Sequence, residues 1–210
     1  MSGKILYLAS ASSRRLELLR QIHIEPRICV ADVDETPLAH EEAQQMVQRL
    51  AFTKATAVAK KLQNELPLAE QKISWVLGAD TTGIVDNPAT LKKEILLKPE
   101  SKRDAFRMWQ LMANRTHQVM TAIALVNVVN VESIFQAHSV SDVEFGSITE
   151  NEMEKYWFGR EPQDKAGAYA IQGYAACWVK HFSGSYSGIV GLPLYETKQL
   201  LKQAGIWGQI

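Results

Sequence analysis

The sequence is short of the residues on which several classes of protein depend. It holds only two cysteines, Cys29 and Cys177, which lie far apart and follow no metal-ligand spacing. So few cysteines in a chain of 210 residues argue against a fold built on disulfides. The five histidines are scattered without a close pair, which argues against a histidine-rich zinc site.

Long apolar runs and an excess of either charge are also missing. The longest apolar region, residues 121–131, is interrupted by Asn127 and Asn130 and is too short to cross a bilayer. The N-terminus has no apolar core of the kind found in signal peptides. Lysine plus arginine and aspartate plus glutamate both number 23, and this balance argues against a stable nucleic-acid partner. We therefore expect a cytoplasmic protein with no membrane association.

The segments that are present alternate between strand and helix patterns, which predicts an α/β fold. Apolar and β-rich runs predict strands at residues 4–9, 27–30, 74–79, 119–128, 133–145 and 176–182. Helical spacing and capping residues predict helices at residues 13–21, 41–62, 101–112, 149–158 and 192–203. Residues 87–93 are typical of a loop or a hairpin tip. The length fits a single domain, 1–210, with a second lobe beginning near Lys102.

An apolar strand pattern near the N-terminus leads through a hydroxyl-rich turn, which includes Ser10, into a helix. The first turn of that helix carries Arg14 and Arg15. The N-terminus of a helix presents unpaired N–H groups and favours anions, so cations placed there as well indicate a phosphate site. A surface helix with solvated arginines is the alternative.

Two groups of carboxylates stand where they can serve chemistry. Asp80 follows the apolar run 75–79 and is expected to end a buried strand, the position at which ligands gather in open α/β sheets. Asp32, Asp34 and Glu35 place three carboxylates within four residues. Such carboxylates bind Mg²⁺ or take a proton from water. The alternatives are a turn or N-cap aspartate at position 80 and a solvated acidic loop.

Three further polar residues lie in apolar or glycine-rich surroundings. Lys54 falls in the apolar stripe of its helix, where it either extends to the edge of the core or reaches into a cleft. Lys98 precedes Pro99 at the end of an apolar run and is either a ligand-binding cation or a charge that protects a strand end. Gln172 offers the donor and the acceptor needed to read a nucleobase edge, unless its segment is only a tight turn.

Taken together, the cations can neutralise a polyphosphate, and the carboxylates can hold a metal and activate water. This is the charge pattern of a metal-dependent phosphoanhydride hydrolase. No serine or cysteine nucleophile beside a histidine and an acid is indicated, so a covalent route has little support.

Ordered motifs from residue 5 to about residue 200 resemble those of the Maf family of nucleoside triphosphate pyrophosphatases. The matching segments are Leu8–Arg15, Asp32–Glu35, Lys54, Leu77–Thr81, Leu97–Pro99, Ala166–Gly173 and Gly191–Pro193. The resemblance implies a two-lobed fold related to the inosine-triphosphate pyrophosphatases, with a mixed twisted sheet, flanking helices and a central cleft. It also implies hydrolysis of nucleoside triphosphates between the α- and β-phosphates, a Mg²⁺ or Mn²⁺ cofactor, and commonly a homodimer.

Roles for individual residues follow from the same resemblance. Asp80 resembles the general base, and Glu35 with Asp80 resembles the pair associated with the metal. The positions that match the polyphosphate-binding residues are Ser10, Arg15, Lys54 and Lys98.

The trio Arg14, Thr81 and Gln172 resembles the branch of the family that acts on dTTP and UTP, because a neutral glutamine complements the imide edge of thymine or uracil. Two alternatives stay open. One is a pyrophosphatase for 7-methyl-GTP or another modified nucleotide, and the other is a non-catalytic nucleotide- or nucleic-acid-binding regulator of cell division.

Overall fold

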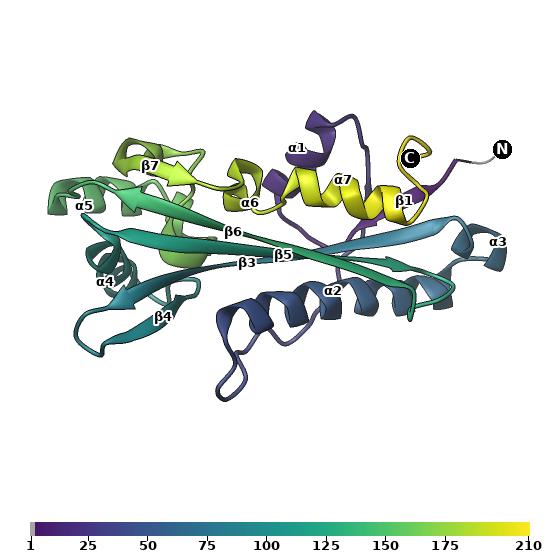
Figure 1. Ribbon diagram of the computed structural model, residues 1–210, viewed down its shortest axis with the longest axis horizontal. Coiled ribbons are helices and arrows are strands. Elements are labelled where there is room, and N and C mark those ends of the chain that lie inside the picture. Colours follow the sequence, from purple (N-terminus) through teal and green to yellow (C-terminus); the bar gives the residue numbers. More distant parts are fainter. Residues whose placement is uncertain (1–2) are drawn as a thin grey trace. The chain divides into compact units, whose positions relative to one another are not determined.

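The structure is a computed structural model that describes residues 3–210, and its strands belong to one mixed sheet with helices packed on it (Figure 1). The strands are β1 Ile5–Leu8, β2 Arg27–Ile28, β3 Ser74–Asn87, β4 Lys92–Leu96, β5 Thr116–Asn127, β6 Ile134–Phe145 and β7 Val179–Ser183. Within the described residues the sheet has seven strands in the order β2-β1-β3-β5-β6-β7, and β4 pairs with β3 off this path. The α/β fold class expected from the sequence is confirmed.

The helices lie between these strands in the sequence. They are α1 Ser13–Gln21, α2 Ala43–Glu65, α3 Leu68–Gln71, α4 Lys102–Met112, α5 Glu150–Phe158, α6 Tyr186–Val190 and α7 Leu194–Gln203, with short 3₁₀ turns η1 Glu161–Asp164, η2 Ala166–Ala168 and η3 Tyr174–Trp178. The capping signals predicted from the sequence are present. The side chain of Ser101 accepts a hydrogen bond from the Asp104 backbone, and Thr149 forms a capping box with Glu152.

The chain divides into two compact units. The first unit comprises Met1–Asp80, Thr121–Ser139 and Gly191–Ile210, and the second comprises Thr81–Met120 and Val140–Val190. The division passes through strands β3, β5 and β6, each of which contributes residues to both units. Residue 102, where we expected a second lobe to begin, falls inside the second unit.

The first unit is built on parallel strands. β1 pairs in parallel with β2 and with the first half of β3, in a register that sets Leu8 beside Leu77. Parallel strands covered on both faces are apolar throughout, as β1 and the start of β3 are. Helix α2 covers one face of these strands, and α1 and α7 lie on the other (Figure 1). The apolar positions that predicted α2 are all buried, as expected for an amphipathic helix.

The second unit contains a hairpin and a group of aromatic residues. Residues 83–87 of β3 pair antiparallel with residues 92–96 of β4, so the predicted segment 87–93 contains the turn of a hairpin, residues 88–91. Helix α4 buries Trp109, whose indole N–H donates a hydrogen bond to the carbonyl oxygen of Ala168 at 2.9 Å. The rings packed around it are referred to below as the aromatic cluster, which consists of Trp109, His117, Phe145, Tyr156, Tyr169 and Trp178.

The bounds of several predicted elements differ from the structure, and three of these differences have a clear cause. β3 does not stop at residue 79 but continues to Asn87, because β4 pairs with its second half. The strand expected at 176–182 begins at Val179, since residues before it form the 3₁₀ turn η3. The last helix begins at Leu194, with Pro193 at its N-cap instead of in its first turn. Gly205 follows that helix at φ 66°, the left-handed conformation expected of a glycine at a helix end.

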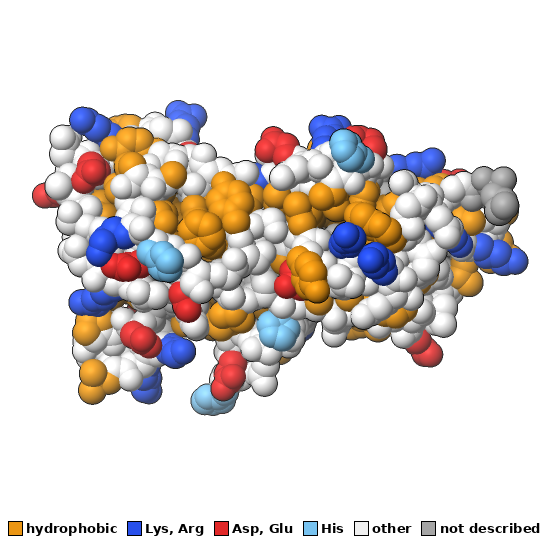
Figure 2. Space-filling view, turned by 45° about the horizontal axis from the view of Figure 1, so that its top comes forward, with side chains coloured by type: hydrophobic (Ala, Val, Ile, Leu, Met, Phe, Trp, Pro, Cys, Tyr) orange, Lys and Arg blue, Asp and Glu red, His pale blue; other side chains and the backbone are white. Residues whose placement is uncertain are grey.

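The surface carries both kinds of charge. On the face shown in Figure 2, lysine, arginine, aspartate and glutamate side chains are interspersed, in keeping with the equal numbers of basic and acidic residues. Among residues 3–210, no helix has both the length and the apolar content needed to cross a membrane.

Candidate functional site

The sequence predicted that Asp80 ends a strand, but in the structure Asp80 lies within β3. Its neighbour β1 pairs with β3 only as far as Leu77, and the last bond between them runs from the Ala9 backbone N–H to the Leu77 carbonyl oxygen. Asp80 therefore lies three residues beyond the point where this parallel pair ends. Ligands gather beyond the ends of parallel strands, so the prediction of position was right relative to β1 and wrong relative to β3.

Helix α2 approaches β3 closely because residue 78 is glycine. A Cβ atom at Gly78 would lie 2.3 Å from the carbonyl oxygen of Ala51 and 2.8 Å from the backbone nitrogen of Ala55. Both atoms belong to the backbone of α2, so no flexible side chain can move away to make room. Lys54 lies on this same turn of the helix, and the close approach brings its side chain to the strand that carries Asp80.

The ammonium group of Lys54 joins two carboxylates. Its Nζ atom lies 2.6 Å from Oδ1 of Asp80 and 2.7 Å from Oε1 of Glu35. The side chains of Lys54 and Asp80 are 13% and 10% exposed, whereas that of Glu35 is 44% exposed. The Lys54 ammonium therefore lies between two carboxylates, one mostly buried and one partly exposed.

Arg15 is held in a fixed direction at the start of α1. Its Nε donates to the carbonyl oxygen of Gly191 at 2.8 Å, and its Nη1 donates to Oγ of Ser10 at 3.0 Å. Burial lowers the pKa of the Arg15 guanidinium, while Asp80 and Glu35 favour its charged form and Arg14 opposes it. Arg15 is thus coupled electrostatically to both carboxylates, and we refer to Arg15, Glu35, Lys54 and Asp80 as the charged cluster.

The electrostatics of Asp80 suit a proton acceptor. Burial raises its pKa above the ordinary value for aspartate, Lys54 and Arg15 lower it, and Glu35 raises it. Burial has the largest effect, so the net shift is upward. A carboxylate whose pKa is raised in this way is a stronger base than an exposed aspartate, and perturbed groups of this kind concentrate at functional sites.

The acidic segment, residues 32–38, contributes the carboxylate of Glu35 to the charged cluster and uses that of Asp34 in a local hydrogen bond. Asp34 accepts a hydrogen bond from the Thr36 backbone N–H at 2.9 Å, and its contacts with Thr36 lower its pKa. Asp32 is exposed. Among residues 3–210 no group of three or more histidine, cysteine, aspartate or glutamate side chains is arranged to hold a metal ion.

The remaining predicted residues belong to four places in the chain. Arg14 is partly buried in the first turn of α1. Thr81, also partly buried, follows Asp80 in β3 and is the first residue of the second unit. Lys98 and Gln172 are exposed in the second unit, Lys98 in the loop after β4 and Gln172 in the turn between η2 and η3.

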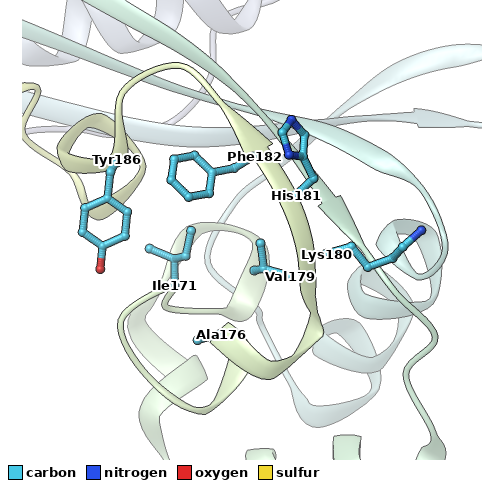
Figure 3. Close-up of a pocket in the computed structure, with 7 residues that line it drawn as sticks. All are labelled: Ile171, Ala176, Val179, Lys180, His181, Phe182 and Tyr186. Carbon is cyan, nitrogen blue, oxygen red and sulfur yellow. The ribbon is translucent and has the colours of Figure 1, made fainter.

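A pocket of about 450 Å³ lies within the second unit, next to this turn (Figure 3). Its lining residues are Ile171, Ala176, Val179, Lys180, His181, Phe182 and Tyr186, so it contains no carboxylate. In Figure 3 the side chain of Lys180 extends away from Phe182 and Tyr186, and it binds Glu144 at 2.5 Å. Apart from Lys180 and His181, the lining side chains are apolar or aromatic, so the pocket offers mainly apolar contact.

Sequence reasoning missed three contributors to the charged cluster. The carbonyl oxygen of Gly191 is 176 residues away from Arg15, so no local pattern links them. Gly78 was noticed only as part of a motif, although its missing side chain admits α2. Arg49, which binds the acidic segment as described below, lies on α2 five residues before Lys54 and is partly buried.

Comparison with known proteins gives consistent results. The family model described as "Maf-like protein" matches residues 5–204. The chain is 43% identical over 205 residues to a protein of Colwellia psychrerythraea named dTTP/UTP pyrophosphatase, covering 98% of this chain and 91% of that protein. It is 44% identical over 202 residues to a protein of the same name from Photobacterium profundum, covering 96% of this chain and 97% of that protein.

Similarity to solved structures is weaker. A HAM1 protein from Coxiella burnetii matches with 18% identity and a TM-score of 0.45, over 68% of this chain and 73% of that one. A likeness at this level supports no statement about the site.

Proposed function

The chain belongs to the Maf family, and we propose that it hydrolyses the α–β phosphoanhydride bond of nucleoside triphosphates, with dTTP and UTP preferred. The products are the nucleoside monophosphate and pyrophosphate. The observation that supports this most directly is the contact of Lys54 with both Glu35 and Asp80. A site that only binds phosphate needs cations, and it gains nothing from two carboxylates beside them.

The proposed reaction is direct attack of water on the α-phosphorus. Asp80 accepts a proton from the water through its carboxylate, a role favoured by the upward shift of its pKa. The bond from the α-phosphorus to the bridging oxygen breaks, and its electrons leave on pyrophosphate. Lys54 and Arg15 stabilise that charge, since fixed cations in a partly buried site lower the energy of a developing anion. Ser10 and Gly191 keep Arg15 in place for this task.

A divalent cation, Mg²⁺ or Mn²⁺, fits the donor set of the charged cluster. Mg²⁺ is usually bound through one or two carboxylates together with substrate phosphates. Glu35 and Asp80 already contact one shared cation, the Lys54 ammonium, and they are the residues that would hold the metal. When bound, the metal supplies neutralisation of the triphosphate oxygens.

Residues elsewhere in the chain complete the proposal. We assign Lys98 to the triphosphate and Arg14, Thr81 and Gln172 to the selection of the nucleotide. The exposed amide of Gln172 can donate and accept hydrogen bonds at once, as the imide edge of uracil or thymine requires. Homodimer formation and a cytoplasmic location remain predictions, the first of which light scattering of the purified protein tests.

The test is a panel of nucleoside triphosphates, including dTTP, UTP, GTP and 7-methyl-GTP, assayed with Mg²⁺ and with Mn²⁺. Both monophosphate and pyrophosphate are measured, because release of orthophosphate would indicate cleavage at another bond. We expect dTTP and UTP to be turned over fastest. Faster turnover of 7-methyl-GTP would overturn the assignment of Gln172, and tight nucleotide binding without product would favour the regulator.

A matched pair of substitutions on one strand tests Asp80 itself. Asp80→Asn removes the proton acceptor and should lower kcat by roughly 100- to 10,000-fold. Asp86→Asn makes the same chemical change at an exposed position six residues further along β3 and should leave kcat unchanged. Equal activities of the two variants would remove Asp80 from the proposed mechanism.

A further inference from the structure

Arg49 on α2 and Glu41 form a two-bond ion pair next to the charged cluster. Nε of Arg49 donates to Oε1 of Glu41 at 2.6 Å, and Nη2 donates to Oε2 at 2.7 Å. The Glu41 side chain is only 7% exposed and that of Arg49 27%. Parallel bonds of this kind fix the direction of both groups as well as their distance. We call this pair the Arg49–Glu41 clasp.

The clasp also fixes the backbone of the acidic segment. Nη2 of Arg49 donates to the carbonyl oxygen of Thr36 at 3.2 Å. Oε2 of Glu41 accepts from the Leu38 backbone N–H at 3.0 Å. The segment between β2 and α2 contains no strand or helix, so its backbone makes no regular hydrogen bonds. The bonds to Arg49 and Glu41 take their place and fix the backbone at Thr36 and Leu38.

Glu35 is joined covalently to the residue that the clasp holds. Thr36 is fixed by Arg49, and Glu35, one residue earlier, contacts Lys54, which lies on α2 five positions after Arg49. Helix α2 therefore holds the segment at two points. Because Glu35 is 44% exposed, an ion pair with Lys54 contributes little order by itself. The backbone anchor at Thr36 adds to that order next to Glu35.

We propose that the Arg49–Glu41 clasp is a positioning device for Glu35, which sets the affinity of the site for its divalent cation. Arg49 and Glu41 act on Glu35 through the backbone at Thr36, and Arg49 also interacts electrostatically with Asp80. Outer residues that orient metal ligands change metal affinity by about 10- to 100-fold when they are removed. The inference rests on the proposed function, in which Glu35 and Asp80 hold the metal.

The first measurement needs no turnover. Mn²⁺ binding to the purified full-length protein is followed by calorimetry, and amide hydrogen exchange is followed across residues 36–41. Arg49→Met should weaken Mn²⁺ binding by about 10-fold or more. It should also speed exchange at the Leu38 amide, which loses its fixed acceptor. Arg49→Lys should recover little, because an ammonium cannot make two parallel bonds.

A matched control separates this effect from the loss of any ion pair. Arg20 makes the same two-bond contact with Glu25, but both side chains are exposed and the pair is near the end of α1. Arg20→Met should leave Mn²⁺ binding and kcat/KM at the wild-type values. An equal loss in Arg20→Met would mean that the effect of Arg49→Met reflects general stability.

A double substitution identifies the residue through which the clasp acts. In a Glu35→Gln background, Arg49→Met should cause no further loss of Mn²⁺ affinity, because its target is already neutral. A further loss of about 10-fold in that background would overturn the proposal. So would unchanged Mn²⁺ binding in Arg49→Met, or wild-type protein that binds no Mn²⁺. Wild-type protein that binds Mn²⁺ in this pattern but hydrolyses no nucleotide would contradict only the proposed function.

Discussion

The two compact units bury polar groups in opposite ways. In the first unit the charged cluster keeps ionised side chains in a partly desolvated place, with Lys54 between two carboxylates. In the second unit the aromatic cluster buries His117 and Tyr169, which share a 2.7 Å hydrogen bond and are surrounded by rings. Burial lowers the pKa of His117 to about 3 and raises that of Tyr169, so both are neutral at ordinary pH.

This contrast separates a site from a core. Burying an ion is costly unless it is paired, and a protein gains stability by replacing such ions with neutral groups. In the aromatic cluster the buried polar groups, His117 and Tyr169, are neutral and pack among the rings. The charged cluster retains the costly arrangement, which is expected where a ligand will use the charges. Substitutions in the charged cluster should therefore change activity, whereas substitutions in the aromatic cluster should change stability alone.

The largest effect is expected from Lys54→Met. Removing the shared cation leaves Arg15 as the remaining cation of the charged cluster beside Asp80 and Glu35, so kcat should fall roughly 100- to 1000-fold. The free energy of unfolding should fall by about 3 kcal/mol, because one partner of a mostly buried pair is lost. Kinetics and urea unfolding measure the two losses. Lys61→Met, an exposed position on the same helix, should change neither, and a similar loss there would contradict the special role of Lys54.

A smaller effect should follow from Gly78→Ala. The added methyl group would meet the backbone of α2 and push the helix away from β3, at a cost of about 1–3 kcal/mol in stability. Because Lys54 moves with the helix, kcat should fall by roughly 10-fold, and the acidic limb of the pH profile should shift upward as Asp80 loses its cation. Gly83→Ala on the same strand, where the nearest atom is 3.4 Å away, is the control. If activity falls equally in both variants, the close packing at Gly78 has no catalytic importance.

In the aromatic cluster, His117→Phe should remove a dependence of stability on pH. The folded protein does not protonate His117 until about pH 3, whereas the unfolded chain does so near 6.5. The unfolded state thus binds the extra proton between these values, so His117 contributes a loss of stability of up to about 1.4 kcal/mol per unit as pH falls through this window. Its Nδ1 has no hydrogen-bond partner among the described residues. Urea unfolding at several pH values should show a flatter profile for the variant, with kcat unchanged at neutral pH; a reduced kcat would blur the distinction between the clusters.

The smallest effect is expected from Ser10→Ala. Arg15 loses one acceptor but keeps the carbonyl oxygen of Gly191, so the loss should be near that of a single hydrogen bond, about 1 kcal/mol. This corresponds to a rise in KM of roughly fivefold for the nucleotide, with kcat nearly unchanged. A Michaelis–Menten comparison with Ser13→Ala, an exposed serine three residues later, measures it. A large fall in kcat would mean that Ser10 touches the reacting atoms.

Local patterns in the sequence predicted local structure well. The bounds of α1 are as predicted, and the capping box at Thr149 marks the start of α5, because both depend on residues within a few positions of each other. Of the residues that the sequence predicted for one site, the structure joins Ser10 to Arg15, and Lys54 to Glu35 and Asp80.

What the sequence could not predict depends on distant partners. The predicted length of β3 was wrong because the second half of the strand is stabilised by pairing with β4. No pattern within residues 74–79 reveals that pairing. The Arg49–Glu41 clasp joins two charges across the start of a helix, where spacing alone does not distinguish a pair from two solvated groups. The roles of Lys98 and Gln172 stay predictions for a related reason, since each depends on a bound nucleotide.

The tie between Arg15 and Gly191 has a consequence for how this protein tolerates change. The acceptor is a main-chain oxygen, which all twenty amino acids supply, so substitution scanning that examines lost side chains would pass over it. Only the course of the chain matters there, and residue 191 adopts φ 127°, a conformation almost restricted to glycine. Mutational tolerance at this position should therefore reflect backbone geometry: a bulkier residue would redirect the carbonyl and disturb an arginine almost the whole chain length away.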